Sequence, residues 1–211
     1  MDKSKVTVLL DNGHGVNTPG KMSPKLEDGR QLFEWAYARE IVNGIAEKLK
    51  AEGIPYYLVR PEDEEIKSQS NDLILRTNRA NAKHAELKKE GKTSLFISIH
   101  VNAAGNSSKW NTASGWTVYI AKSASSNSKK LAQILYGEAE KRNLKGNRSI
   151  RPEKYLVNDF WVVRKTVMPA VLTENLFMDN KSDVEFLLSD EGKRTIIDLH
   201  VEGIKKYIES L

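Results

Sequence analysis

The sequence of 211 residues contains no cysteine, which excludes disulfide bonds and zinc sites built from thiolates. No apolar run approaches the length that a helix needs to cross a bilayer. The first residues, MDKSK, lead directly into a strand-like run and contain no apolar core of a signal peptide. We therefore expect a protein that is made in the cytoplasm without a transmembrane segment, and that acts outside the cell only after release or lysis.

The bulk composition is that of an ordinary globular protein, with 39% hydrophobic and 29% charged residues. At this length we expect one domain spanning residues 1–211, with no separate binding module. The net charge of +5 has two interpretations. It favours an anionic partner, such as nucleic acid or a bacterial wall bearing carboxylates and phosphates, or it belongs to a solvated surface kept for solubility.

Apolar runs that suit strands alternate along the chain with stretches of helical periodicity. We expect strands at residues 6–10, 56–59, 94–100, 115–120, 160–163 and 168–173. We expect helices at residues 32–51, 71–90 and 191–208, another through 131–139, and a short one at the capping-box pattern of Ser182 and Glu185. This alternation predicts an α/β fold, a single domain with a mostly parallel twisted sheet of about six strands and helices on both faces.

Two of the four histidines, His14 and His100, follow apolar strands directly. Ligands of open α/β sheets bind beyond the carboxyl ends of the strands, and neutral imidazole is a common zinc ligand. Taken alone, each histidine is more often a hydrogen-bonded structural residue, but the pair together favours a metal site. His84 and His200 fall within helical patterns among charged neighbours, and we expect both at the surface.

A zinc site of the His₂Glu type needs one carboxylate ligand. Glu34 lies in the first turn of the helix that follows the His14 loop, where its plainer role is to stabilise the helix dipole. Glu40 is the competing candidate for the carboxylate ligand, but it lies nearly two turns further along the helix. Glu34 is therefore the candidate third ligand.

A second acidic residue, Glu174, directly follows the apolar strand Met168–Thr173. A buried carboxylate without a partner is costly, so this position indicates either a structural salt bridge or a catalytic group. Beside a metal, Glu174 is suited to act as general base toward a water and then as general acid toward a leaving amine. Trp116 and Trp161 suit core packing, whereas Trp110 lies in a polar loop and is the better candidate for binding a sugar.

Five motifs in order resemble the zinc-dependent N-acetylmuramoyl-L-alanine amidases of the type 3 family, which cleave peptidoglycan. They are DNGHG at 11–15, LVR at 58–60, RTNRAN at 76–81, SIHVNA at 98–103 and MPAVLTE at 168–174, the last followed by Phe177 and Asn180 at the expected offsets. The sequence departs from the family pattern at Asn12, where proline is usual, and at Leu176, where glycine is usual. Glu34 is also followed by Trp-Ala in place of the usual Lys-Asp.

The resemblance implies one Zn²⁺ per chain on His14, Glu34 and His100, with Glu174 as the catalytic acid–base. Asn102, Trp110 and Asn180 are the candidate substrate-binding residues. The expected reaction is hydrolysis of the amide between N-acetylmuramic acid and L-alanine by a zinc-activated water. Some members carry a long autoinhibitory helix where this chain has only residues 121–128, so we expect a constitutively open site.

The expected partner is peptidoglycan, with no nucleic acid, and a monomer is favoured. The expected lack of a signal peptide and of a separate wall-binding module suits a phage-type lysin or a wall-remodelling enzyme. Two alternatives remain open. The same three ligands suit a zinc peptidase that cuts the stem peptide, and a non-catalytic module for peptidoglycan or nucleic acid would need neither Glu174 nor a metal.

Overall fold

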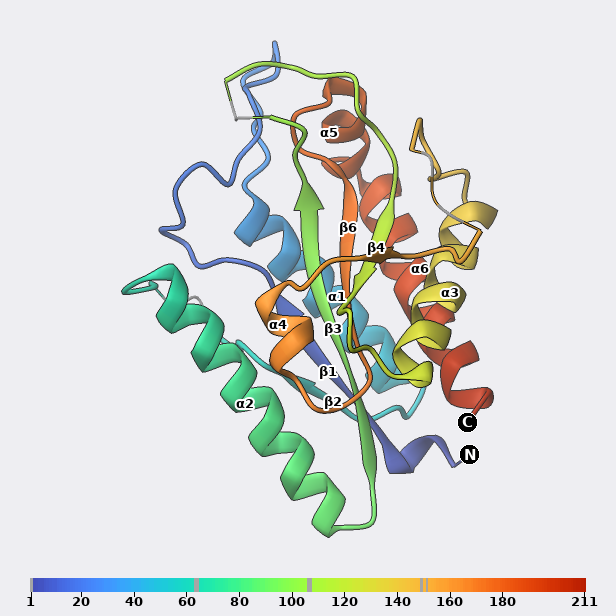
Figure 1. Cartoon of the computed structure of the whole chain (residues 1–211). Helices are drawn as coiled ribbons and strands as arrows, with labels where there is room; N and C mark the ends of the chain where they lie inside the picture. The colour runs from blue at the N-terminus through green and yellow to red at the C-terminus, as the bar shows by residue number, and fades with distance from the viewer. Residues whose placement is uncertain (1, 63–64, 106–107, 149, 151) are drawn as a thin grey trace.

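The computed structural model describes residues 2–62, 65–105, 108–148, 150 and 152–211. Its six strands are β1 (Val6–Asn12), β2 (Tyr56–Leu58), β3 (Thr93–Asn102), β4 (Thr117–Ile120), β5 (Leu156–Val157) and β6 (Ala170–Phe177). They form one sheet in the order β2-β1-β3-β6-β4-β5, with β3 at the centre of the view (Figure 1). All neighbouring pairs are parallel except β4 and β6, which are antiparallel. The predicted mostly parallel α/β sheet is confirmed.

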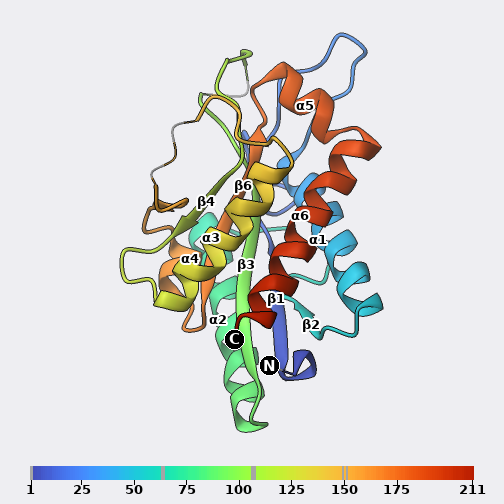
Figure 2. The ribbon, with the colours of Figure 1, turned by 90° about the vertical axis from the view of Figure 1, so that its right-hand side faces the viewer.

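Helices cover both faces of the sheet, as the side view shows (Figure 2). One face carries α1 (Glu34–Ala51), α3 (Ser126–Lys141) and α6 (Asp190–Glu209), and the other carries α2 (Gln69–Lys89) and α4 (Trp161–Lys165). A short helix, α5 (Lys181–Leu187), follows β6, and a 3₁₀ turn (Lys3–Lys5) precedes β1. No helix in the described part of the chain combines the length and the apolar character that crossing a membrane requires.

The two faces of the sheet build separate apolar cores. Ile97 and Ile99 of β3 belong to the larger cluster, together with residues of α1, α3 and α6. Phe96 belongs to the smaller cluster under α2 and α4. Because successive side chains of a strand point to opposite faces, Ser98 and His100 share the α2 and α4 side with Phe96. The candidate ligand His100 therefore lies on the face of the sheet that α2 and α4 cover.

One predicted strand is wrong. Residues 160–163 were expected to form a strand, but Trp161 begins the helix α4, and the edge strand β5 lies earlier, at Leu156–Val157. A short apolar run does not distinguish a strand from a buried helical turn by periodicity. Here Val162 and Val163 are buried against the smaller core as one turn of helix, a packing that only the tertiary structure provides.

The predicted capping box is also wrong. The N-cap of α5 is Asn180, whose side chain accepts a hydrogen bond from the backbone N–H of Asp183. Asparagine caps helices as well as serine does, so the helix begins at Lys181 and Ser182 lies inside it.

The expectation that the two remaining histidines lie at the surface is wrong for His200, which is fully buried within α6. His84 is half-buried on α2, with Nδ1 2.8 Å from the hydroxyl of Ser94.

Candidate active site

His14 reaches the site through a glycine turn at the end of β1. The Gly13 N–H donates to the carbonyl of Ile99 on β3 at 3.0 Å, and a Cβ at position 13 would overlap the ring of His100. Only glycine therefore lets the two strands deliver their imidazoles side by side. His14 itself adopts a left-handed conformation, with φ of 65°. The two rings meet edge to face with their centroids 4.9 Å apart.

Glu34 is the first residue of α1 and lies between the two imidazoles, with 1% of its surface exposed. Its Oε1 atom is 3.0 Å from His100 Nδ1 and accepts the backbone N–H of Val101. Its Oε2 atom is 3.2 Å from His14 Nε2 and 3.8 Å from Lys21 Nζ. One donor atom from each of His14, Glu34 and His100 lies within 4.8 Å of the other two.

The competing carboxylate, Glu40, lies elsewhere. It is exposed on α1 and forms an ion pair with Lys193 of α6, at 2.8 Å.

The protonation states of this group suit a metal. Burial lowers the pKa of His14 to about 4. Burial works to raise the pKa of Glu34, but the facing imidazoles of His100 and His14 hold that pKa well below its usual range. Near neutral pH the site thus presents an unprotonated His14 imidazole and an ionised carboxylate, and metal ligands must be deprotonated in this way.

Glu174 lies beside this group on the neighbouring strand. It is the register partner of His100 in the parallel pair of β3 and β6, and β6 continues beyond it to Phe177. Among the described residues, none hydrogen-bonds the buried Oε2 atom of Glu174. Burial, followed by the negative charge of Glu34, raises the pKa of Glu174 well above its usual value. Within the described part of the chain, the side chain is therefore held next to the site without the salt bridge that a structural role would require.

A buried ionic network supports the floor of the site. Asp11 of β1 is fully buried and accepts hydrogen bonds from Arg76 Nε, at 2.8 Å, and from the hydroxyl of Ser98, at 2.6 Å. Arg76 also reaches Asp72 on the preceding turn of α2, and Asp72 pairs with Arg60. No role was predicted for these residues from the sequence, although Asp11 and Arg76 belong to two of the motifs that carry the family resemblance.

A cleft of about 210 Å³ opens beside the two imidazoles. Its lining includes His14, Lys21, His100, Phe160, Trp161 and Glu174. Trp161 was expected to pack in the core, but it stands in the wall of this cleft at the start of α4. The side chains of Arg164 and Lys165 lie over its ring, 5.4 and 5.3 Å from the centroid. The cleft thus combines aromatic surface with cationic groups near the candidate catalytic centre.

The three candidate substrate-binding residues lie outside the described lining of this cleft. Asn102 ends β3 and accepts the N–H of Ala103, and Trp110 packs against the larger core. Asn180 donates to the carbonyl of Ala113 in addition to capping α5. Their role in binding substrate stays a prediction.

Leu176, which replaces a glycine usual at this position, keeps the backbone shape that glycine favours. Its φ is 64°, in the left-handed region that costs about 1–2 kcal/mol for a residue with a side chain. The side chain is buried in the larger core with 4% of its surface exposed. Burial of a leucine contributes about 1.5–3 kcal/mol, so packing offsets the cost of the backbone conformation.

The donor set fits a zinc ion. Two imidazole nitrogens and a carboxylate are a ligand set found in catalytic zinc sites. Glu34 Oε2 is buried and makes no hydrogen bond within the described residues, although it faces His14 Nε2. A cation between the two atoms would satisfy both.

Comparison with known proteins agrees with this geometry. The model of the N-acetylmuramoyl-L-alanine amidase family matches residues 8–206. The chain is 31% identical over 201 residues to the endolysin of Bacillus phage SPP1, a match that covers 95% of this chain and 65% of that protein. It is 27% identical over 205 residues to the probable cell wall amidase LytH of Staphylococcus aureus, covering 97% of this chain and 59% of that protein.

A solved structure gives the same result. The N-acetylmuramoyl-L-alanine amidase from Clostridium difficile 630 aligns with a TM-score of 0.76 and 26% identity, and the alignment covers 98% of both chains. The chain spans less than two thirds of the length of the phage and staphylococcal relatives. The family model, in contrast, matches nearly the whole chain. This protein belongs to the N-acetylmuramoyl-L-alanine amidase family.

Proposed function

We propose that this chain hydrolyses the amide bond between the lactyl group of N-acetylmuramic acid and L-alanine in peptidoglycan, as a zinc enzyme. The observation that carries the proposal is the convergence of His14, Glu34 and His100 beside Glu174, in a chain that the amidase family model matches. The buried Oε2 atom of Glu174 has no hydrogen-bond partner among the described residues. His14, Glu34 and His100 would hold the zinc.

When bound, the zinc would polarise the scissile carbonyl and lower the pKa of water at the site. Glu174 would take the proton of the attacking water at its carboxylate and then deliver that proton to the alanine nitrogen as the C–N bond breaks. The burial that raises the pKa of Glu174 favours this role, because the acid must hold the proton between the two steps. The neighbouring cation Lys21 and the zinc would keep the carboxylate available as a base at the start.

The decisive experiment is dye release from purified sacculi by the untreated chain, by the chain after chelation, and by the chelated chain after zinc is added back. We expect full activity, loss of activity and recovery, in that order. Glu34→Ala should lose bound zinc, and Glu40→Ala is the matched control on the same helix that should keep it. Undiminished activity in the chelated chain would contradict the proposal.

Product analysis distinguishes the proposed reaction from a peptidase reaction. An amidase releases the amino group of L-alanine and leaves a free lactyl carboxylate on the sugar, whereas a peptidase cuts between two amino acids of the stem. Mass spectrometry of digested muropeptides separates the two. We expect intact stem peptides and unsubstituted muramic acid.

We further propose that the site is open without activation. The link between β4 and α3 comprises only residues 121–125, which is too short for an inserted blocking helix. Product should therefore be released linearly with time from the first seconds. The rate of hydrolysis should not rise after limited proteolysis of α2 or the His14 loop. Action on the wall after release, and a monomeric state, remain expectations that fractionation and light scattering test.

A further inference from the structure

The ring of His100 contacts two oxygens, one through each nitrogen. Nδ1 is 3.0 Å from Glu34 Oε1, and Nε2 is 3.1 Å from the hydroxyl oxygen of Ser98. A neutral imidazole carries one proton, so one nitrogen donates and the other presents a lone pair. One contact on each side of the ring therefore fixes its direction, with Nδ1 toward Glu34 and Nε2 toward Ser98.

The hydroxyl of Ser98 has one proton to give, and two neighbours compete for it. The carboxylate of Asp11 is 2.6 Å away, whereas His100 Nε2 is 3.1 Å away. A hydrogen bond to an ionised carboxylate is shorter and roughly twice as strong as one between neutral groups, so the proton points to Asp11. The oxygen of Ser98 then accepts from Arg76 Nη2 at 3.3 Å and lies 3.1 Å from His100 Nε2.

We infer that Asp11 and Ser98 are positioning residues that hold the ring of His100 in the orientation in which its Nδ1 atom faces Glu34 and the site. This inference rests on the proposed function, because His100 is a proposed zinc ligand. Nδ1 lies 3.0 Å from Glu34 Oε1, on the side of the ring opposite to Ser98. Asp11 and Ser98 thus fix the direction of His100 before a cation binds.

Asp11, which accepts the hydrogen bond of Ser98, is itself held in a fixed position. Arg76 donates to both of its oxygens, and both residues are buried. Arg76 in turn is tied to Asp72 on its own helix. The orientation of His100 on β3 is therefore linked, through β1, to α2 on the same side of the sheet.

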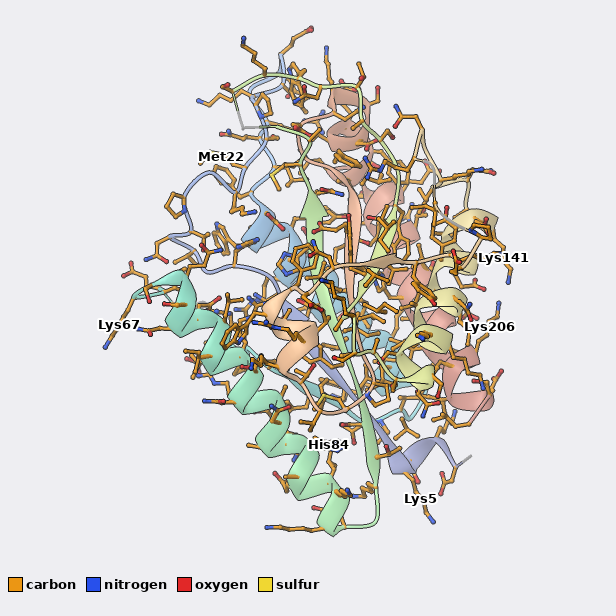
Figure 3. All side chains as sticks on the ribbon, viewed as in Figure 1. Lys5, Met22, Lys67, His84, Lys141 and Lys206 are labelled. Carbon is orange, nitrogen blue, oxygen red and sulfur yellow. The ribbon has the colours of Figure 1, made fainter. Side chains whose placement is uncertain are left out.

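Ser98→Ala tests the inference, and the chain offers a matched control. Ser94 lies on the same strand and the same face, is buried, and contacts a histidine through its hydroxyl, but that histidine is His84 on the lower part of α2 (Figure 3). Ser94→Ala therefore removes the same kind of contact away from the site. Zinc affinity of the metal-free proteins is measured by competition with a coloured chelator.

We expect Ser98→Ala to bind zinc about 10–100-fold more weakly than the wild type, the usual effect of removing a group that orients a histidine ligand. Ser94→Ala should bind zinc as the wild type does, and Ser98→Thr, which keeps the hydroxyl, should recover most of the affinity. Equal affinities of Ser98→Ala and Ser94→Ala would overturn the inference.

Nuclear magnetic resonance of the zinc-loaded protein gives a second readout that does not depend on activity. The ¹⁵N shifts of His100 should identify Nδ1 as metal-bound and Nε2 as protonated, and the Nε2 proton should exchange faster in Ser98→Ala. Zinc on Nε2 would overturn the inference while leaving the proposed function intact. A wild-type chain that binds no zinc would instead overturn the proposed function, and the inference with it.

Discussion

The polar side chains on the two faces of β6 differ in their hydrogen bonding. Glu174 points toward the cleft with a buried oxygen that makes no hydrogen bond among the described residues. Thr173 and Asn175, its neighbours along the strand, point to the other face and are fully buried within a hydrogen-bonded network. Because native proteins rarely leave buried polar atoms unpaired, the difference marks Glu174 as the candidate for chemistry and Thr173 and Asn175 as structural residues.

On the face of β6 that carries Thr173 and Asn175, both side chains make several contacts with neighbouring elements. Asn175 donates to the carbonyl of His100 at 2.9 Å and accepts from the indole of Trp116 at 2.7 Å. The Thr173 hydroxyl is 3.1 Å from His200 Nε2, and His200 Nδ1 lies 2.8 Å from the carbonyl of Ile196. The bond from Asn175 joins β6 to β3 at the register where His100 and Glu174 lie side by side, and the contact of Thr173 with His200 joins β6 to α6.

The largest effect should come from removing a proposed zinc ligand. His14→Ala should lose stoichiometric zinc and all wall hydrolysis while the network around Asn175 keeps the fold. Metal analysis and dye release measure the two effects. His84→Ala, which alters a histidine away from the site, should keep both zinc and activity, and full zinc content in His14→Ala would contradict the assigned ligand set.

Glu174→Gln separates chemistry from metal binding on the cleft face. We expect hydrolysis to fall by about 10²–10⁴-fold, the usual contribution of a general acid–base, with zinc content unchanged. Since the substitution removes a costly buried charge, the free energy of unfolding should stay the same or rise. Steady-state rates and urea unfolding test both expectations. Full activity would remove the assigned role, and a large loss of stability would indicate a structural carboxylate.

Asn175→Ala should give the reverse pattern on the other face. It leaves the indole N–H of Trp116 and the carbonyl of His100 without the side-chain partner that each has now. Each buried group left unsatisfied costs about 1–3 kcal/mol, so the free energy of unfolding should fall by at least that amount. Urea unfolding measures the loss. An unchanged midpoint would show that the network does not stabilise the strand.

The last prediction concerns the pH dependence of stability, which changes no contact of the site. Burial lowers the pKa of His200 to about 4, against about 6.5 for an exposed histidine. Between these values the unfolded chain binds the extra proton and the folded chain does not. Stability should therefore fall by about 3 kcal/mol as the pH drops from 6.5 to 4, and this contribution should be constant below pH 4.

Comparison of urea unfolding across that pH range in the wild type and in His200→Gln isolates this contribution. The variant, which lacks a titrating group at this position, should show a shallower pH dependence. Identical slopes in the two proteins would mean that His200 is not the residue responsible.

Much of the fold follows from the sequence because its main strands and helices are long and strongly periodic. The run that ends at His14, the run that ends at His100 and the strand before Glu174 are each apolar enough to be buried on both faces. The parallel pairing that brings their ends together follows from the alternation with helices. The errors lie in short segments, such as residues 160–163 and the cap at Asn180, where few residues carry the signal.

The burial of His200 could not be predicted from its neighbours in the sequence. Its neighbours on α6 include charged residues, which indicate a solvated helix, but one face of α6 packs against α1 and α3. The network of Asp11, Ser98 and Arg76 was missed because its members lie on three elements. Motifs marked those residues without indicating that they contact one another.

By itself, the amino-acid sequence determined the fold class, the candidate ligands His14, Glu34 and His100, and Glu174 as the acidic residue to examine, because residue type and strand periodicity are local properties. Only the tertiary structure decided that Glu34 lies between the two imidazoles while Glu40 faces α6, and that Trp161 lines the cleft. It also decided which nitrogen of His100 faces which oxygen. These distinctions depend on distances between side chains far apart in the chain, which arise only when the strands pair and the helices pack.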